Sequence, residues 1–144
     1  MKYILFTLSL ILCLGLPNIQ VQAQSEILGT WLNTDKTAQI KIINNEGEYL
    51  GKITWLDVPG LEDSQVLDLA NEDESLRDRP VMGLTILKGL TYDGEKWKGG
   101  EIYDPKSGKT YSCEARVNDP NKLELKGYIG FSWIGRTVEW TKVK

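Results

Sequence analysis

The sequence predicts an all-β protein, an eight-stranded antiparallel up-and-down barrel with one long acidic loop that carries a short helix. Segments of alternating apolar and polar residues run through most of the chain, and hairpin turns separate nearly all of them. An open meander would leave two unpaired sheet edges, and closure into a barrel removes both. Gly29-Thr30-Trp31 near the start and 135–140 near the end fit such a closure, with Arg136 packed over Trp31. A flat sheet or a sandwich is the alternative architecture.

Residues 1–23 have the three-part layout of a secretory signal peptide. Lys2 precedes an apolar run over 3–16, and small residues ending at Ala23 form a cleavage site. The run is too short for a spanning helix, which needs about 20 apolar residues. We therefore expect a periplasmic or secreted protein without a membrane span, cut near Ala23, with residues 24–144 as a single barrel domain.

Eight segments have the alternation and the length of strands. They cover residues 27–33, 37–44, 48–56, 82–92, 95–104, 109–117, 122–130 and 134–143. Asp93-Gly94 is a strong hairpin signal between the fourth and fifth segments. Gly99-Gly100, inside the fifth, indicates a bulge or a sharp bend, which reverses the facing of the residues that follow.

The alternation also identifies the residues that we expect on the inner face. The apolar faces of the second, third and sixth segments carry Ala38, Ile40 and Ile42; Tyr49, Gly51, Ile53 and Trp55; and Tyr111, Cys113, Ala115 and Val117. The interior of an eight-stranded barrel is either filled by side chains or holds one small ligand. The sequence leaves both outcomes open.

Residues 57–80, here called the lid, interrupt the strand pattern with eight acidic residues and two arginines. A short helix is expected over 64–70, with Asp63 as its N-cap. A calcium loop is disfavoured because the glycine and the ligand spacing of such loops are absent. We expect a solvated lid that Leu76, Arg77 and Arg79 pin to the barrel. Long connections of this kind are often lids or binding loops.

The composition argues against several functional classes. The chain has no histidine, which removes Ser-His-Asp and Cys-His catalysis and histidine-ligated zinc. Its net charge of −3 argues against a nucleic-acid-binding protein, which needs clustered Lys and Arg. Loss of Cys13 with the signal peptide would leave Cys113 as the only thiol, and we expect it to be buried and inert. No cofactor and no metal site are expected.

The candidate ligand-binding residues are aromatic or charged side chains expected in the barrel or at its rim. They are Trp55, Trp97, Glu101, Tyr103, Tyr111, Tyr128 and Arg136. Arg136 shares the apolar face of the last strand with Val138 and Trp140. Its structural interpretation is barrel closure together with Gly29 and Trp31. Its functional interpretation is an interior anchor for a carboxylate or a phosphate.

A set of short motifs spans nearly all of the chain beyond the signal peptide. They are Gly29-x-Trp31, Gly51-Lys52-Ile53-x-Trp55, Asn71 with Leu76-Arg77-x-Arg79-Pro80 and Gly83-Leu84, Gly99-Gly100-x-Ile102-Tyr103-Asp104-Pro105, Gly108-Lys109-Thr110-Tyr111, Gly127-Tyr128-x-Gly130 and Gly135-Arg136-Thr137. In this combination the chain resembles a family of exported bacterial proteins known as domain of unknown function 2147. Asn71-Glu72-Asp73 departs from the Asn-Pro-Asp more usual in that family.

The Gly-x-Trp start and the arginine of the last strand are also similar to those of lipocalin and fatty-acid-binding barrels. That resemblance implies a calycin-like barrel that encloses a small apolar molecule. The family resemblance brings no established activity.

Three functions are compatible with the sequence. The leading hypothesis is an exported, non-catalytic protein of the cell envelope that binds a small apolar or amphipathic ligand, such as a lipid fragment. The second is an interaction or scaffolding module with a filled barrel, which docks an envelope protein through its outer surface or its lid. The third is an enzyme that uses carboxylates such as Glu101 and Asp104.

Overall fold

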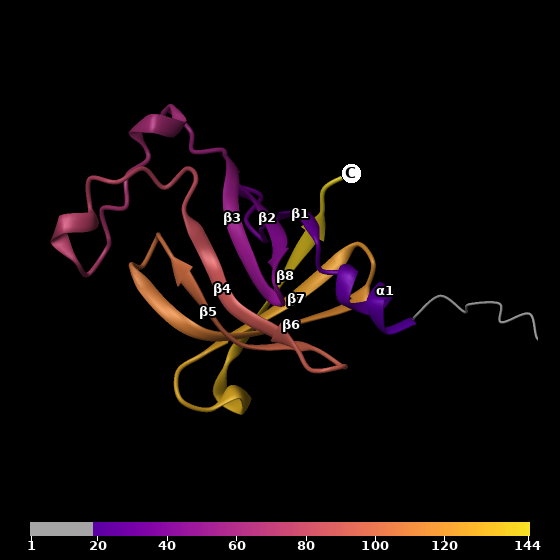
Figure 1. Cartoon of the computed structure of the whole chain (residues 1–144). Helices are drawn as coiled ribbons and strands as arrows, with labels where there is room; N and C mark the ends of the chain where they lie inside the picture. The colour runs from indigo at the N-terminus through magenta and orange to yellow at the C-terminus, as the bar shows by residue number, and fades with distance from the viewer. Residues whose placement is uncertain (1–18) are drawn as a thin grey trace, which may run out of the picture.

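Eight antiparallel strands close into a barrel, in which each strand pairs with the next along the chain and the last pairs with the first. The computed structural model describes residues 19–144 (Figure 1). The strands are β1 (Gly29–Leu32), β2 (Ala38–Asn45), β3 (Glu48–Leu56), β4 (Thr85–Tyr92), β5 (Trp97–Asp104), β6 (Lys109–Asp119), β7 (Lys122–Tyr128) and β8 (Arg136–Lys142). The predicted up-and-down barrel is confirmed.

Helical structure is limited to short pieces. They are α1 (Ile19–Ser25) and the 3-10 turns η1 (Asp63–Gln65), η2 (Glu74–Leu76) and η3 (Ser132–Ile134). No helix of the described residues is long and apolar enough to cross a membrane. Most of the predicted signal peptide lies outside these residues, so its cleavage near Ala23 stays a prediction.

The helix predicted over 64–70 is wrong. Only η1 forms there, with Glu62 rather than Asp63 as its N-cap, and the chain then runs extended. The Val81 N–H donates to the Val66 carbonyl at 2.8 Å, and the Asp68 N–H donates to the Arg79 carbonyl at 3.0 Å. These bonds tie the two arms of the lid together, so the backbone cannot close helical bonds along the chain.

The core is one cluster of buried apolar side chains that point into the barrel. Its buried members come from every strand and include Trp31, Ile40, Tyr49, Leu87, Trp97, Cys113, Leu125 and Trp140. Cys113 is buried as predicted, and burial raises the pKa of its thiol to about 12. The thiol is therefore protonated and inert at neutral pH.

The segment between α1 and β1 closes one end of the barrel. Ile27 is fully buried there, and its carbonyl accepts a hydrogen bond from Trp31 Nε1 at 2.8 Å. The Tyr49 hydroxyl donates to the Gln24 carbonyl at 3.1 Å. These contacts involve residues that lie after the predicted cleavage site, so the processed chain would keep this closure.

The cation that covers Trp31 is Lys142, and the prediction that Arg136 does so is wrong. Lys142 Nζ lies 4.2 Å from the centroid of the Trp31 ring and donates to the carbonyls of Glu26 and Leu28. In the register between β1 and β8, Lys142 is the direct partner of Trp31. Arg136 lies six residues earlier and pairs with Gly127, about 20 Å away along the strand.

The buried position of Trp31 predicts that Trp31→Ala lowers the free energy of unfolding by about 3–5 kcal/mol, the usual cost of truncating a buried aromatic side chain. Urea denaturation measures this change. Trp133→Ala is the matched control, because Trp133 is 73% exposed and its loss should change stability by less than about 0.5 kcal/mol. A loss below about 1 kcal/mol for Trp31→Ala would contradict its role in the core.

The position of Lys142 over Trp31 leads to a second prediction. Lys142→Met should lower the free energy of unfolding by about 1–2 kcal/mol, because it removes a cation–π contact and charged hydrogen bonds to two carbonyls. Arg136→Met at the exposed far end of β8 should stay within about 0.5 kcal/mol of the wild type in the same urea titration. The reverse order of the two effects would restore Arg136 as the closing residue.

Candidate functional site

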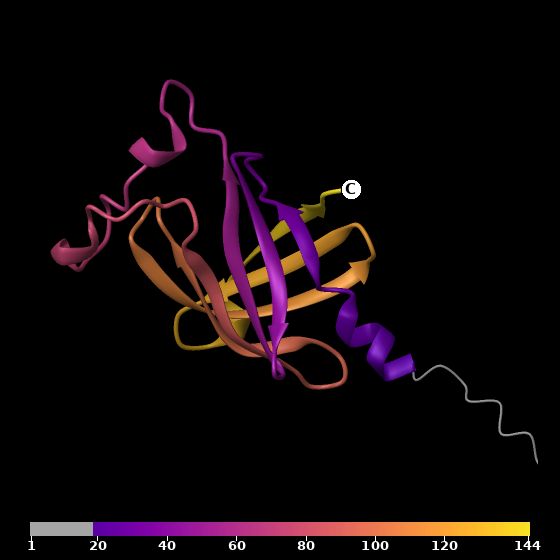
Figure 2. The ribbon, with the colours of Figure 1, turned by 45° about the horizontal axis from the view of Figure 1, so that its top comes forward.

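The two ends of the barrel differ in what they carry (Figure 2). The lid, the β1–β2 and β5–β6 turns and the β7–β8 loop all emerge at one end, here called the mouth. The other end, here called the α1 end, carries α1 and the remaining hairpins. This division follows from the strand order, because alternate connections of an up-and-down barrel lie at the same end.

Burial of the inward-facing side chains changes from one end to the other. Near the α1 end, Tyr49, Trp97 and Leu123 are at most 2% exposed, although Tyr92 beside Trp97 is half-buried. At the mouth, the inward-facing residues of the same sheet are only half-buried. These are Leu56 of β3, Ile102 of β5, Tyr111 of β6 and Val138 of β8. Solvent therefore reaches the inner face at the mouth, whereas the core around Tyr49, Trp97 and Leu123 excludes it.

Side chains fill the barrel at its middle. A Cβ atom added to Gly51 would lie 2.9 Å from Leu87 Cβ, and one added to Gly100 would lie 2.7 Å from Leu90 Cγ. Neither position has room for a methyl group, because side chains from β4 already occupy that space. The middle of the barrel is therefore filled by side chains, as one of the two expected outcomes required, and a ligand would bind nearer the mouth.

Charged side chains surround the mouth. Lys106 of the β5–β6 turn pairs with Asp35 of the β1–β2 turn at 2.7 Å. Because these turns are four strands apart in a closed eight-stranded barrel, the ion pair bridges opposite sides of the mouth. The hydrogen bond and the charge of Lys106 lower the pKa of Asp35, and Arg136 adds to the same effect. Arg136 is therefore within electrostatic reach of this bridge.

The lid is held to the outside of β5 by a buried carboxylate. Asp68 is fully buried and accepts a hydrogen bond from the Tyr103 hydroxyl at 2.5 Å and from Asn71 Nδ2 at 2.8 Å. Arg79 contributes Nε at 2.9 Å and Nη2 at 2.8 Å. Burial, and then the bond to Asp68, raise the pKa of Tyr103. Every oxygen of Asp68 has a partner, so its role is to hold the lid.

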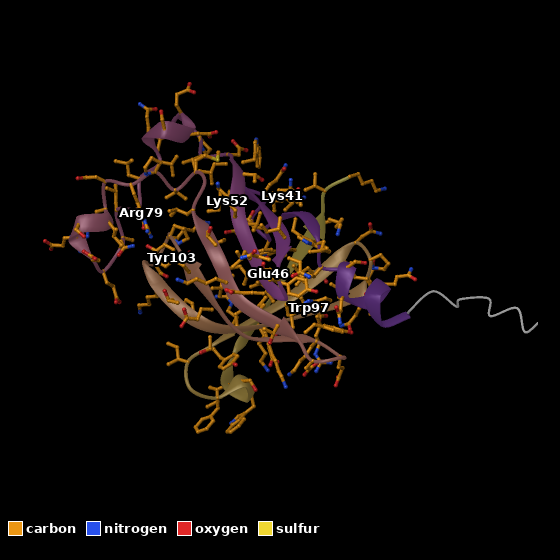
Figure 3. All side chains as sticks on the ribbon, viewed as in Figure 1. Lys41, Glu46, Lys52, Arg79, Trp97 and Tyr103 are labelled. Carbon is orange, nitrogen blue, oxygen red and sulfur yellow. The ribbon has the colours of Figure 1, made fainter. Side chains whose placement is uncertain are left out.

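Figure 3 shows Arg79 beside Tyr103, and the guanidinium carbon lies 5.7 Å from the ring centroid. The same region explains Gly108 in the β5–β6 turn. Its φ is +72°, and an added Cβ would lie 1.7 Å from the Ala70 carbonyl oxygen. The lid backbone therefore lies directly on this turn, which only glycine allows.

The structure brings two of the predicted ligand-binding residues to the mouth. Tyr111 faces inward there, and Arg136 lies on the same face of β8 as Val138. Trp97 is at the α1 end, packed edge-on against Tyr49 at 5.9 Å, so it lies away from the mouth (Figure 3).

The other four predicted residues lie on the outer face. A bulge in β3 pairs Trp55 with Gln39 and reverses its facing, so the ring is 38% exposed outside the barrel. Glu101 is exposed beside Lys88, and Tyr128 pairs with Ser112. Tyr103 holds the lid. The sequence analysis missed the Lys106–Asp35 bridge and the role of Asp68, because contacts between distant segments leave no local pattern.

A groove on the outer face and a metal site were the other candidates, and neither is a better site than the mouth. A polar groove of about 240 Å³ on the outer face of β6–β8 has Glu114 and Arg116 in its lining. Both are already paired, with Lys96 at 2.8 Å and Glu95 at 2.9 Å. Over residues 19–144 no group of three or more acidic or cysteine side chains is placed to hold a metal ion.

Comparisons with known proteins agree with this architecture. The chain belongs to the family described as "Uncharacterized protein conserved in bacteria (DUF2147)", whose model matches residues 29–142. A solved structure from Helicobacter pylori, described as a protein of the lipocalin family, superposes with a TM-score of 0.72. The two chains are 24% identical over 81% of this chain and 82% of the other, so the likeness establishes the fold. A search of curated proteins finds no match.

The hydrogen bonds of the lid give a further prediction. Tyr103→Phe removes one bond to the buried carboxylate, so the free energy of unfolding should fall by about 1–2 kcal/mol. Hydrogen exchange should accelerate at lid amides such as those of Asp68 and Val81. Tyr92→Phe is the control, because its hydroxyl bonds only to the exposed Gly94 carbonyl. Unchanged exchange in the lid would mean that Tyr103 does not hold it.

Proposed function

We propose that this protein is an exported, non-catalytic binding protein of the cell envelope, and that it accepts a small apolar or amphipathic molecule at the mouth of its barrel. One observation carries the proposal: the inner face is tightly packed around Tyr49, Trp97 and Leu123 and partly exposed at the mouth. Eight-stranded barrels of this type hold single small ligands. The signal-peptide pattern of residues 1–23 supports export.

The residues at the mouth suit an amphipathic ligand. Ile102 and Val138 offer apolar surface to an alkyl chain, and Arg136 lies on the inner face above them. Over the described residues no carboxylate lies within ion-pair distance of Arg136. Its guanidinium is therefore available to a carboxylate or phosphate group of the ligand. The filled middle of the barrel limits the ligand to a short apolar part.

The carboxylates considered for catalysis support a non-catalytic function. Asp104 is engaged in its own turn, where it accepts hydrogen bonds from the Lys106 N–H at 3.0 Å and the Ser107 hydroxyl at 2.7 Å. Glu101 is exposed on the outer face of β5. The two do not converge on the mouth with a proton donor, as acid–base catalysis would need.

A second candidate is an interaction module that docks an envelope protein through the lid. The observation that favours it is the exposure of Leu61 and Leu69, which are 50% and 67% exposed among the acidic residues of the lid. A partner of this surface would present basic and apolar side chains. The filled barrel middle is compatible with this function as well.

Binding at the mouth is tested with octanoate and with octanol, which has the same chain length but no charge. Arg136→Gln should weaken octanoate binding about tenfold, because it removes a charge-assisted hydrogen bond, and should leave octanol binding unchanged. Titration followed by backbone NMR shifts measures both affinities and locates the site at Ile102 and Val138.

Arg116→Gln is the matched control on the outer face, where Arg116 pairs with Glu95. It should bind both probes as the wild type does. Shifts confined to residues away from the mouth, or no saturation by either probe, would contradict the proposal. Shifts in the lid on addition of envelope proteins would then favour the docking module.

A further inference from the structure

The β7–β8 loop is short, yet it exposes four large apolar side chains to solvent. Residues 129–134, here called the apolar tip, hold Ile129 at 76% exposure, Phe131 at 58%, Trp133 at 73% and Ile134 at 70%. The rings of Phe131 and Trp133 stack with centroids 4.4 Å apart. Clustered exposure of large apolar side chains marks an interaction surface.

Backbone hydrogen bonds and a close strand contact hold the loop in this conformation. The turn η3 is held by hydrogen bonds from the Ile134 N–H to the Phe131 carbonyl and from the Gly135 N–H to the Ser132 carbonyl, at 3.2 and 3.3 Å. A Cβ atom on Gly135 would lie 2.7 Å from the Gly127 carbonyl oxygen. Only glycine lets the strands approach so closely here. The loop therefore leaves the barrel as a short projecting turn (Figure 1).

The charges around the tip indicate what covers it. No charged residue occurs from Gly127 to Gly135, and a cation bounds this stretch on each side: Lys126 on β7 and Arg136 on β8. The two lie one residue apart in the β7–β8 register, because Lys126 pairs with Thr137 and Gly127 with Arg136. They therefore lie on opposite faces of the sheet, and Glu114 is the cross-strand neighbour of Lys126. An uncharged aromatic end with one cation on each face of the sheet above it fits the interface of a bilayer, with anionic headgroups at the level of the cations.

We propose that the apolar tip inserts into the surface of a lipid bilayer that contains anionic phospholipids. The tip comprises only residues 129–134, and so short a loop suits the roughly 5–10 Å to which interfacial segments enter a membrane. A convex projection suits a deformable lipid surface. This inference does not depend on a ligand in the mouth.

The acidic lid does not oppose this orientation. It connects β3 to β4, four strands from the β7–β8 loop in the closed barrel. Figures 1 and 2 both show the lid and the tip projecting in different directions. A membrane in contact with the tip therefore meets Lys126 and Arg136 before it meets the acidic side chains of the lid.

The test uses the protein as recovered after export, with its N-terminus determined by mass spectrometry, because the apolar run 3–16 would itself partition into lipid. Vesicles of phosphatidylcholine with 30% phosphatidylglycerol are compared with vesicles of phosphatidylcholine alone in a sedimentation assay. The double variant Phe131→Ser/Trp133→Ser should bind the anionic vesicles at least about tenfold more weakly than the wild type. Lys126→Gln should weaken binding to anionic vesicles only.

The double variant Leu61→Ser/Leu69→Ser is the matched control, because it removes two exposed apolar side chains from the lid. It should bind as the wild type does. An environment-sensitive dye attached through Ser132→Cys reports on the tip without removing it, and one attached through Asn45→Cys reports on the α1 end. The buried Cys113 thiol does not compete for the dye at neutral pH.

The proposal predicts a blue shift of the dye at position 132 and none at position 45. Equal vesicle binding by the wild type and the tip variant, or a dye at position 132 that stays in water, would overturn it. Self-association in sedimentation analysis that the tip variant abolishes, without vesicle binding, would instead identify a second copy of the chain as the occupant. Failure to bind octanoate in the mouth would leave the lipid result unaffected.

Discussion

The alternation of connections in an up-and-down barrel is the constraint on which the rest of the molecule depends. Because successive strands run in opposite directions, every second connection emerges at the same end. The lid, the Lys106–Asp35 bridge and the apolar tip therefore share the mouth, whereas α1 and the buried Ile27 share the other end. One end can be packed for stability because the residues available for binding are gathered at the other.

The strands and their closure could be predicted because alternation is a local property of the chain. The closing cation could not. Arg136 and Lys142 lie on the same face of β8, so alternation fits either of them over Trp31. The choice depends on the stagger between β8 and β1, which is set by the tilt of the whole barrel and not by residues near either cation. Lys142 is the partner in the observed register.

The site residues show the same division between local and long-range information. The facing of Trp55 is lost at a bulge, because one extra residue in β3 moves the ring from the inner to the outer face. Asp68 looks like one more solvated acid of the lid, yet it is fully buried. Its burial depends on Tyr103 and Arg79, which are 35 and 11 residues away in the sequence. Of the arginines expected to pin the lid to the barrel, Arg79 bonds Asp68 and lies over Tyr103 of β5, whereas Arg77 bonds only lid residues.

The two proposals meet at Arg136, which is the first residue of β8 and lies directly after the apolar tip and Gly135. With the tip in a bilayer, this guanidinium stands at the level of the headgroups and the mouth opens beside the membrane. An amphipathic molecule could then move from lipid to barrel while its charged group stays on one cation. The alkyl chain of that molecule would then avoid bulk water. Exposure to water costs an alkyl chain about 0.8 kcal/mol of free energy for each methylene group. The mouth lowers that cost because it lies at the same end of the barrel as the tip. An opening at the α1 end would face away from the membrane.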